Sequence, residues 1–290
     1  MAGVDVFTTH RPMLFGLAYR MLGSVMDAED IVQEAYLRWQ QVEGATVEEP
    51  RAYLTTVVTR LCIDHLRSAR MRREQYVGPW LPEPLVTDQA PEVSNAPALA
   101  ESLSMAFLVL LETLTPQERA VFLLHDVFGY SYAEIATIIG KSEANCRQIG
   151  GRARKRVEER RPRFDASPDQ QERLLRRFVQ ASTNGDMDAL LGLLADDVTL
   201  WADGGGKVQA ALHPIHGARN VARGALAALA KAPPGLAVRI APVNGRPGII
   251  AEIDGQPYSV LTIEVVGDRI QTIHTVANPD KLASRPHQLR

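Results

Sequence analysis

Apolar residues recur at helical spacing through the first quarter of the chain, up to about residue 75. The runs "MLFGLAYRML" and "DAEDIVQEAYLRWQQV" place apolar side chains three and four positions apart, which is typical of amphipathic helices. After the break "EEP", the stretch "RAYLTTVVTRLCIDHLRSARMRRE" predicts a long amphipathic helix that becomes basic toward its end. We therefore expect residues 1–75 to form an all-α domain.

The pattern then breaks at a proline-rich stretch, 76–98, where the closely spaced prolines exclude a helix and indicate a linker. This linker also carries apolar side chains that a purely flexible tether does not need. They are Tyr76, Trp80, Leu81, Leu85 and Val86. We therefore expect the segment to dock on a folded surface.

Helical spacing returns over 99–162, with two signals for helix starts. Thr115 with Glu118, and Ser131 with Glu134, have the spacing of capping boxes, and Gly140 is a helix stop. A further helix begins near Ser142. A capped helix, a tight turn and a second helix together predict a helix-turn-helix, whose second helix lies in the major groove of DNA.

The second helix of this pair has the chemistry of a DNA reader. Its start offers side chains that hydrogen-bond base edges, namely Glu143, Asn145, Arg147 and Gln148. Its later turns offer cations suited to phosphates, namely Arg152, Arg154, Lys155 and Arg156. A solvated basic helix end is the alternative, but the capped helix and turn before it favour DNA. The basic helix near residue 70, with Arg60, Arg67, Arg70, Arg72 and Arg73, suggests a second DNA contact.

The last segment, 168–284, changes from helical spacing to alternation. Two short helical runs precede the strand-like runs "DVTLWAD", "LAVRIAPV", "GIIAEIDG", "YSVLTIEVV" and "RIQTIHTV". Turn signals at Asn244-Gly245, Asp254-Gly255 and Gly267-Asp268 separate the later runs. This order predicts an α+β domain with a curved antiparallel sheet.

Composition narrows the class of protein further. A net charge of -2, with 46% apolar and 23% charged residues, fits a globular multi-domain protein and not a polybasic nucleic-acid binder. No apolar run has the length of a membrane span. Two cysteines, Cys62 and Cys146, suit a reducing cytoplasm. We expect a cytoplasmic protein without metal or cofactor.

The stretch "DGGGK" at 203–207 looks at first like a phosphate-binding loop. A Walker loop, however, needs Ser or Thr after the lysine and a following helix, whereas Val208 follows Lys207 here. Glycines also permit positive φ and close approach of the backbone to another surface. A simple hairpin turn and a contact loop both remain open.

At this point the chain resembles the extracytoplasmic-function sigma factors of bacterial RNA polymerase. "DAEDIVQEAYLRWQ" is similar to their region 2 helix that binds polymerase core, "PRAYLTTVVTRLCIDHLRSARMRRE" to the part that melts and reads the −10 element, and the block 114–157 to region 4, the −35 reader. The resemblance implies core binding through Asp27, Glu29, Asp30, Val32, Gln33 and Glu34. It implies −10 contacts by Arg60, Arg67 and Arg70, with Tyr53 able to stack on a base.

One local feature departs from the family pattern. Gly150 and Gly151 stand where region 4 usually has better helix formers, at a cost of about 1 kcal/mol each. We therefore expect the recognition helix to fray in isolation.

The remainder resembles the sigma-J-like group, whose members add a SnoaL-like domain of the NTF2 superfamily. The matching motifs are "WLPEP", "DGGGK", "NGRPG" and "NPDKL". They imply a C-terminal domain that modulates the sigma factor, in place of or in addition to a separate anti-sigma factor. The implied contact residues are Trp80, Leu81, Pro82, Asp203, Gly204, Gly205, Gly206, Lys207, Asn244, Gly245 and Arg246.

Two rival functions stay open. One is a helix-turn-helix regulator that senses a ligand, and the other is a bifunctional protein with an enzymatic NTF2-like pocket. The acid–base candidates for such a pocket are Asp203, His213, His216, Tyr258 and His274. No two of them have a diagnostic spacing, so we expect no catalysis and leave binding of a small ligand open.

Overall fold

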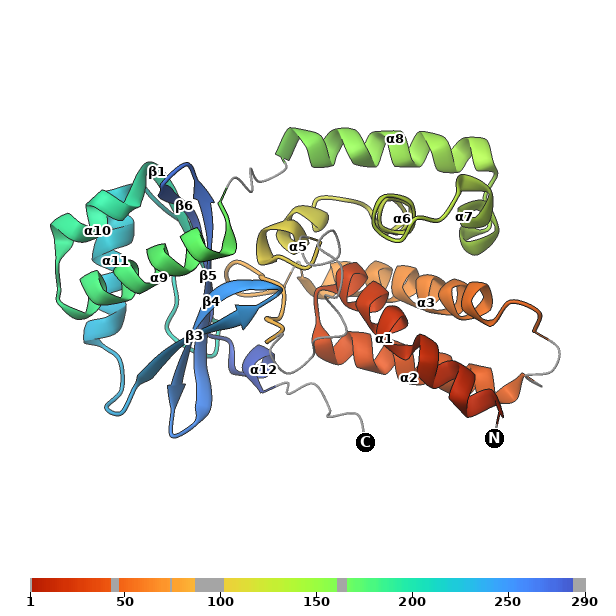
Figure 1. Ribbon diagram of the computed structural model, residues 1–290, viewed down its shortest axis with the longest axis horizontal. Helices are drawn as coiled ribbons and strands as arrows, with labels where there is room; N and C mark the ends of the chain where they lie inside the picture. Colours follow the sequence, from red (N-terminus) through yellow and green to blue (C-terminus); the bar gives the residue numbers. More distant parts are fainter. Residues whose placement is uncertain (1, 43–46, 74, 87–101, 161–165, 284–290) are drawn as a thin grey trace. The chain divides into compact units, whose positions relative to one another are not determined.

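The computed structural model describes residues 2–42, 47–73, 75–86, 102–160 and 166–283, which divide into two compact units (Figure 1). The helical unit holds the described residues up to 75, then 102–103 and 107–160. The α+β unit holds 76–86, 104–106 and 166–283. In these ranges no helix is both long and apolar enough to cross a membrane.

The helical unit begins with three helices that pack on one another, followed by the helix-turn-helix. Its helices, with one π-helical turn at Leu123–Val127, are α1 (Ala2–Leu22), α2 (Val25–Gln41), α3 (Pro50–Arg73), α5 (Met105–Leu111, whose first two residues belong to the other unit), α6 (Pro116–Phe122), α7 (Tyr132–Ile139) and α8 (Glu143–Arg160). The core that α1, α2 and α3 share is apolar, as the helical spacing predicts, and includes Leu17, Ala35 and Leu54, all buried.

The helix starts expected from the sequence are confirmed. The side chains of Thr115 and Ser131 each accept a hydrogen bond from the backbone N–H of the glutamate three residues on. Each glutamate carboxylate in turn accepts one from the backbone N–H of its cap residue, so both capping boxes form. Gly140 ends α7 in the left-handed conformation, with φ of 68°. Ser142 caps α8 through Asn145 N at 3.3 Å. Helix α6 ends at Phe122, and the π-helical turn Leu123–Val127 follows it directly.

The α+β unit packs helices against a six-stranded sheet of order β2-β1-β6-β5-β4-β3. Its elements are α9 (Pro168–Thr183), α10 (Met187–Leu193), β1 (Leu194–Asp203), β2 (Ile215–His216), α11 (Ala218–Ala230), β3 (Ala237–Val243), β4 (Arg246–Ile253), β5 (Gln256–Val266), β6 (Arg269–Val276) and α12 (Pro279–Leu282). Helices α9, α10 and α11 share an apolar core with the sheet that includes Phe178, Leu190, Val221 and Ile273.

Strands β3 to β6 form the expected antiparallel meander, but the sheet is not wholly antiparallel. Asn244-Gly245 and Asp254-Gly255 turn the chain with positive φ at both residues of each pair, as in type I′ hairpin turns. Strand β1, in contrast, pairs parallel with β6. A parallel pair needs a crossover connection, and α11 with the meander supplies it. The result is an α+β fold, as expected, with a sheet that is mostly antiparallel.

Candidate nucleic-acid interface

Helix α8 presents most of its polar and basic residues to solvent. The exposed residues among the sequence-based candidates are Glu143, Asn145, Arg147, Gln148, Arg152, Lys155 and Arg156, and Arg156 also pairs with Glu118 at 2.7 Å. Arg154 differs, because its Nε donates to Asp126 at 2.7 Å and its Nη2 to the Tyr132 hydroxyl at 2.9 Å. The Asp126 carboxylate, through that hydrogen bond, raises the pKa of Arg154. Arg154 is therefore turned toward the protein, whereas the other seven candidates are exposed.

The two glycines of α8 have different surroundings. A Cβ atom at Gly150 would lie 2.7 Å from the Tyr132 hydroxyl oxygen, so only glycine leaves room for the ring. A Cβ atom at Gly151 would meet nothing within 4 Å. The structure keeps α8 helical through both positions. Packing of Tyr132 on Gly150 thus offsets the low helix propensity that led us to expect fraying.

Helix α3 turns part of its basic face toward the helix-turn-helix. Arg60 Nε donates to Ile138 O at 2.8 Å and its Nη2 to Thr137 O at 3.2 Å, at the C-terminal end of α7. Arg67 is exposed and pairs with Asp64 at 3.2 Å. The side chain of Arg70 lies outside the described part of the chain. Tyr53 is partly buried, with its ring 5.9 Å from that of Trp39.

Buried polar contacts join the first three helices to those around the helix-turn-helix. Arg119 of α6, 3% exposed, donates to Met21 O at 2.6 Å and to Glu112 at 2.8 Å. Arg20 of α1, 1% exposed, donates to Ser102 at 2.9 Å, and burial lowers its pKa to about 10. These contacts, together with those of Arg60, hold the two parts of the helical unit together.

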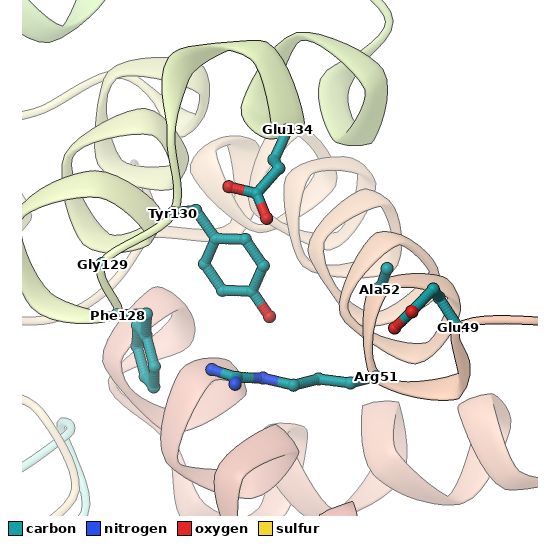
Figure 2. A pocket seen from close by; sticks show the side chains of 7 residues that line it. All are labelled: Glu49, Arg51, Ala52, Phe128, Gly129, Tyr130 and Glu134. Atoms are coloured by element: carbon teal, nitrogen blue, oxygen red, sulfur yellow. The ribbon is translucent and has the colours of Figure 1, made fainter.

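A cleft opens where α3 meets the turn before α7. Figure 2 shows the Arg51 side chain passing beneath the Tyr130 ring toward Phe128, with Glu134 on the far side. The Arg51 guanidinium carbon lies 5.5 Å from the Tyr130 ring centre. The Tyr130 hydroxyl lies 2.9 Å from the Thr55 hydroxyl. Hydrogen bonds from Ser131, and more weakly the charge of Arg51, lower the pKa of Glu134.

The six candidates for core binding on α2 differ in their exposure to solvent. Asp30 and Gln33 are exposed. They lie in a stripe with Met26 and Leu37, which are 58% and 47% exposed at positions four before Asp30 and four after Gln33. Val32 is buried at 1% exposure, so its side chain packs in the unit and is not free to meet a partner. Three acidic residues are half-buried or paired, namely Asp27 with His65, Glu29 with Arg11 and Glu34 with Arg38.

In the α+β unit, Asp203 anchors the linker. Its carboxylate is fully buried and accepts hydrogen bonds from the Tyr76 hydroxyl at 2.6 Å, Leu81 N at 2.9 Å, Gly205 N at 3.1 Å and Lys281 Nζ at 2.7 Å. Burial, and then the hydrogen bond to Asp203, raise the pKa of Tyr76. We call these five residues the Asp203 cluster. The described part of the linker, 76–86, therefore docks, as its apolar residues predict.

A second point of attachment lies at the turn before β4. Leu85 N donates to the Asn244 side chain at 3.1 Å, and Asn244 N donates to Leu85 O at 2.7 Å. Between the two attachment points, Leu81 and Pro82 are buried and Lys281 Nζ lies 4.2 Å from the Trp80 ring centre. Arg246 was expected to reach across an interface and donates to Ala166 O at 3.3 Å within the α+β unit.

The three glycines of "DGGGK" allow this docking. A Cβ atom at Gly204 would lie 2.7 Å from Ala210 Cβ, one at Gly205 would overlap the Asn278 amide, and one at Gly206 would lie 3.1 Å from Val77 of the linker. Gly205 and Gly206 also have positive φ. Lys207 instead pairs with Asp280 at 2.6 Å on the surface. The geometry favours a contact loop over a simple hairpin turn.

The acid–base candidates do not converge on one pocket. His213, His216 and Tyr258 are exposed, and Asp203 is committed to its cluster. His274 is buried, and burial lowers its pKa to about 4. Its Nδ1 lies 3.6 Å from Glu264, whose pKa burial raises to about 7, so both groups are neutral between these values and form no ion pair. They alternate with Ile263 and Ile273 and so face away from the apolar core.

Comparison with known proteins assigns the class. Residues 6–72 match the model of Sigma-70 region 2, and residues 104–157 match the model of Sigma-70, region 4. The chain belongs to the extracytoplasmic-function sigma factors of RNA polymerase, which direct transcription initiation. Within that family it is similar to SigJ of Mycobacterium tuberculosis, with 40% identity over 98% of this chain and 94% of the relative.

Two further similarities extend over nearly the whole chain. The crystal structure of SigJ matches with a TM-score of 0.78 and 37% identity, covering 98% of this chain and all of the other. A probable sigma factor of the same organism, SigI, is 34% identical over 94% of this chain and 92% of its own length.

A ligand-sensing regulator does not need the region 2 match, so that alternative falls away. Sigma factors themselves are not enzymes and act by binding polymerase core and promoter elements.

Proposed function

We propose that the α+β unit modulates promoter-specific initiation by holding the linker between region 2 and region 4, in place of or in addition to a separate anti-sigma factor. The Asp203 cluster carries this proposal. A buried carboxylate with four hydrogen-bond donors, two of them from the linker, ties 76–81 to the unit. Asn244 ties Leu85 to the same unit.

Docking matters because the linker determines how far the two DNA readers can part. By their names the −35 and −10 elements lie about 25 base pairs apart, or about 85 Å at 3.4 Å per pair. In the helical unit, Arg60 of α3 contacts the end of α7. The readers must therefore separate to bind both elements. Segment 76–86, while it is docked, cannot lengthen to allow that separation.

The remaining surfaces take the roles that the family resemblance implies. Core polymerase would meet the exposed stripe of α2, with Asp30 and Gln33 at its centre and Met26 and Leu37 as apolar contacts. The outward residues of α8 would read the −35 element. Arg60, Arg67 and Arg70 of α3 would contact the −10 region once α7 has moved away.

Run-off transcription with purified core polymerase tests the regulatory role. Asp203→Asn removes the negative charge that pairs with the Lys281 ammonium, and Trp80→Ala removes the aromatic ring beside that ammonium. Each should change the transcript yield, upward if docking restrains initiation and downward if docking assists it. Lys207→Ala is the matched control, because its exposed ion pair with Asp280 contributes about 0–1 kcal/mol to stability.

Core binding, measured on the same variants, separates regulation from damage to the sigma regions. The proposal expects Asp203→Asn to bind core like wild type. Equal transcription from wild type, Asp203→Asn and Trp80→Ala, across several promoters and salt concentrations, would leave the α+β unit as an independent domain. Charge reversal at Asp30 should reduce core binding, and unchanged affinity would move that interface off α2.

A further inference from the structure

Tyr132, the first residue of α7, lies at the centre of an aromatic and cationic cluster against α8. Its ring stacks on His125, with centres 4.2 Å apart and planes at 22°. The guanidinium carbons of Arg147 and Arg154 lie 5.4 Å and 6.0 Å from the same ring centre. Arg154 also donates to the Tyr132 hydroxyl at 2.9 Å. One ring therefore contacts both an outward and an inward arginine of α8.

The ring is fixed from both sides. On the α8 side, a Cβ atom at Gly150 would lie 2.7 Å from the hydroxyl oxygen and 3.1 Å from Cε1, so the ring lies directly on the helix backbone. On the other side, His125 is part of the π-helical turn, where Phe128 N donates to Leu123 O at 3.0 Å. His125 Nδ1 lies 2.8 Å from Tyr130 O, which fixes the imidazole. π-helical turns are frequent at functional sites.

We propose that Tyr132 is a positioning residue for sequence discrimination by α8. Its ring restricts Arg147, whose side chain is 63% exposed and also pairs with Glu143, to the outward face of the helix. A guanidinium that is already oriented loses less rotational freedom on binding a base edge. The proposal gives Tyr132 itself no contact with a base. The inference rests on the proposed reading of the −35 element by α8.

The test uses the full-length chain and a DNA duplex that the wild-type protein selects from a random library, with a scrambled duplex of equal composition. Tyr132→Leu removes the ring and should lower the ratio of the two affinities about two- to fivefold, the range for an exposed cation–π contact. Tyr132→Phe keeps the ring and should keep the ratio. Affinity for the scrambled duplex should stay unchanged in both, because every cation is retained. Tyr258→Leu, an exposed tyrosine of the α+β unit, is the control.

Two further variants make the result decisive. Gly150→Ala displaces the ring while favouring helix, so it should lower the ratio even if Tyr132→Leu fails to fold. In an Arg147→Ala background, Tyr132→Leu should cause no further loss of discrimination. An unchanged ratio in Tyr132→Leu or, if that variant does not fold, in Gly150→Ala overturns the inference, as does an additive loss in the double variant. If wild type selects no duplex, or Arg147→Ala loses nothing, the proposed reading by α8 fails instead.

Discussion

Helices α3 and α8 carry similar runs of arginine but present them differently. On α8, Arg147, Arg152 and Lys155 face solvent. On α3, Arg60 donates to two carbonyls at the end of α7. The carbonyl end of a helix carries partial negative charge and attracts a cation much as a phosphate does. The expected −35 reader is therefore open in this arrangement, while part of the expected −10 reader is occupied by the protein itself.

The comparison shows that a basic run in a sequence does not distinguish a free cation from one that binds internally. Arg154 makes the same point within α8, since Asp126 and Tyr132 hold it. An arginine with good internal acceptors stabilises the fold and is costly to withdraw. Four tests probe the division between inward and outward cations, beginning with the most buried one.

Arg119→Leu should have the largest effect. Its guanidinium is 3% exposed and joins α6 to Met21 O and Glu112, so removing it leaves both acceptors without this donor. Breaking a buried pair in this way costs about 3–5 kcal/mol. Hydrogen exchange should reveal lost protection in α1 and α6. Arg152→Leu on the exposed side of α8 is the control, and equal protection in the two variants would contradict the comparison.

Local signals allowed much of the fold to be predicted. The capping boxes at Thr115 and Ser131 and the turns at Asn244 and Asp254 depend on residues within three positions, so sequence spacing alone reveals them. Helix α11 was missed, because its "ALAALA" segment is apolar without a distinct polar face. The parallel pairing of β1 with β6 was missed as well, because pairing partners 70 or more residues apart leave no local pattern.

Several site residues were predicted from the sequence, but the residues that they contact were not. The family motifs pointed to Asp203 and Trp80, yet the donor Tyr76 lies 127 residues away from Asp203. Arg60 was assigned to DNA, and its contact with Ile138 arises only when α3 packs on α7. The role of Gly150 in the folded chain was missed for the same reason, since the Tyr132 ring that needs the space comes from another helix.

Arg147→Ala should weaken binding of the full-length protein to a −35 duplex by about 1–3 kcal/mol, if its outward guanidinium meets a base edge. The loss should be confined to the preferred sequence. Competition titrations with the selected and a scrambled duplex measure it. An equal loss on both duplexes would make Arg147 a phosphate contact, and no loss on either would remove α8 from the DNA interface.

Arg60→Met should have a smaller effect on stability than Arg119→Leu. Its side chain is exposed, so loss of the bonds to Ile138 O and Thr137 O should cost about 1 kcal/mol. Hydrogen exchange should accelerate at the end of α7. Arg67→Met, which loses only a surface pair with Asp64, should leave α7 unchanged. Equal exchange in the two variants would mean that Arg60 does not hold α7.

Lys155 and Arg154 give the most sensitive test, because they are adjacent on α8 but one side chain points outward and the other inward. Lys155 is exposed, so Lys155→Ala should weaken binding to all duplexes alike and reduce the slope of log affinity against log salt by about 1. Arg154→Ala should leave that slope unchanged, since its guanidinium already binds Asp126 and Tyr132. Its cost should fall instead on the stability of the helix-turn-helix. If Arg154→Ala reduced the salt slope as much as Lys155→Ala, Arg154 would have to leave Asp126 for a phosphate when DNA binds. The division between inward and outward cations would then describe only the free protein.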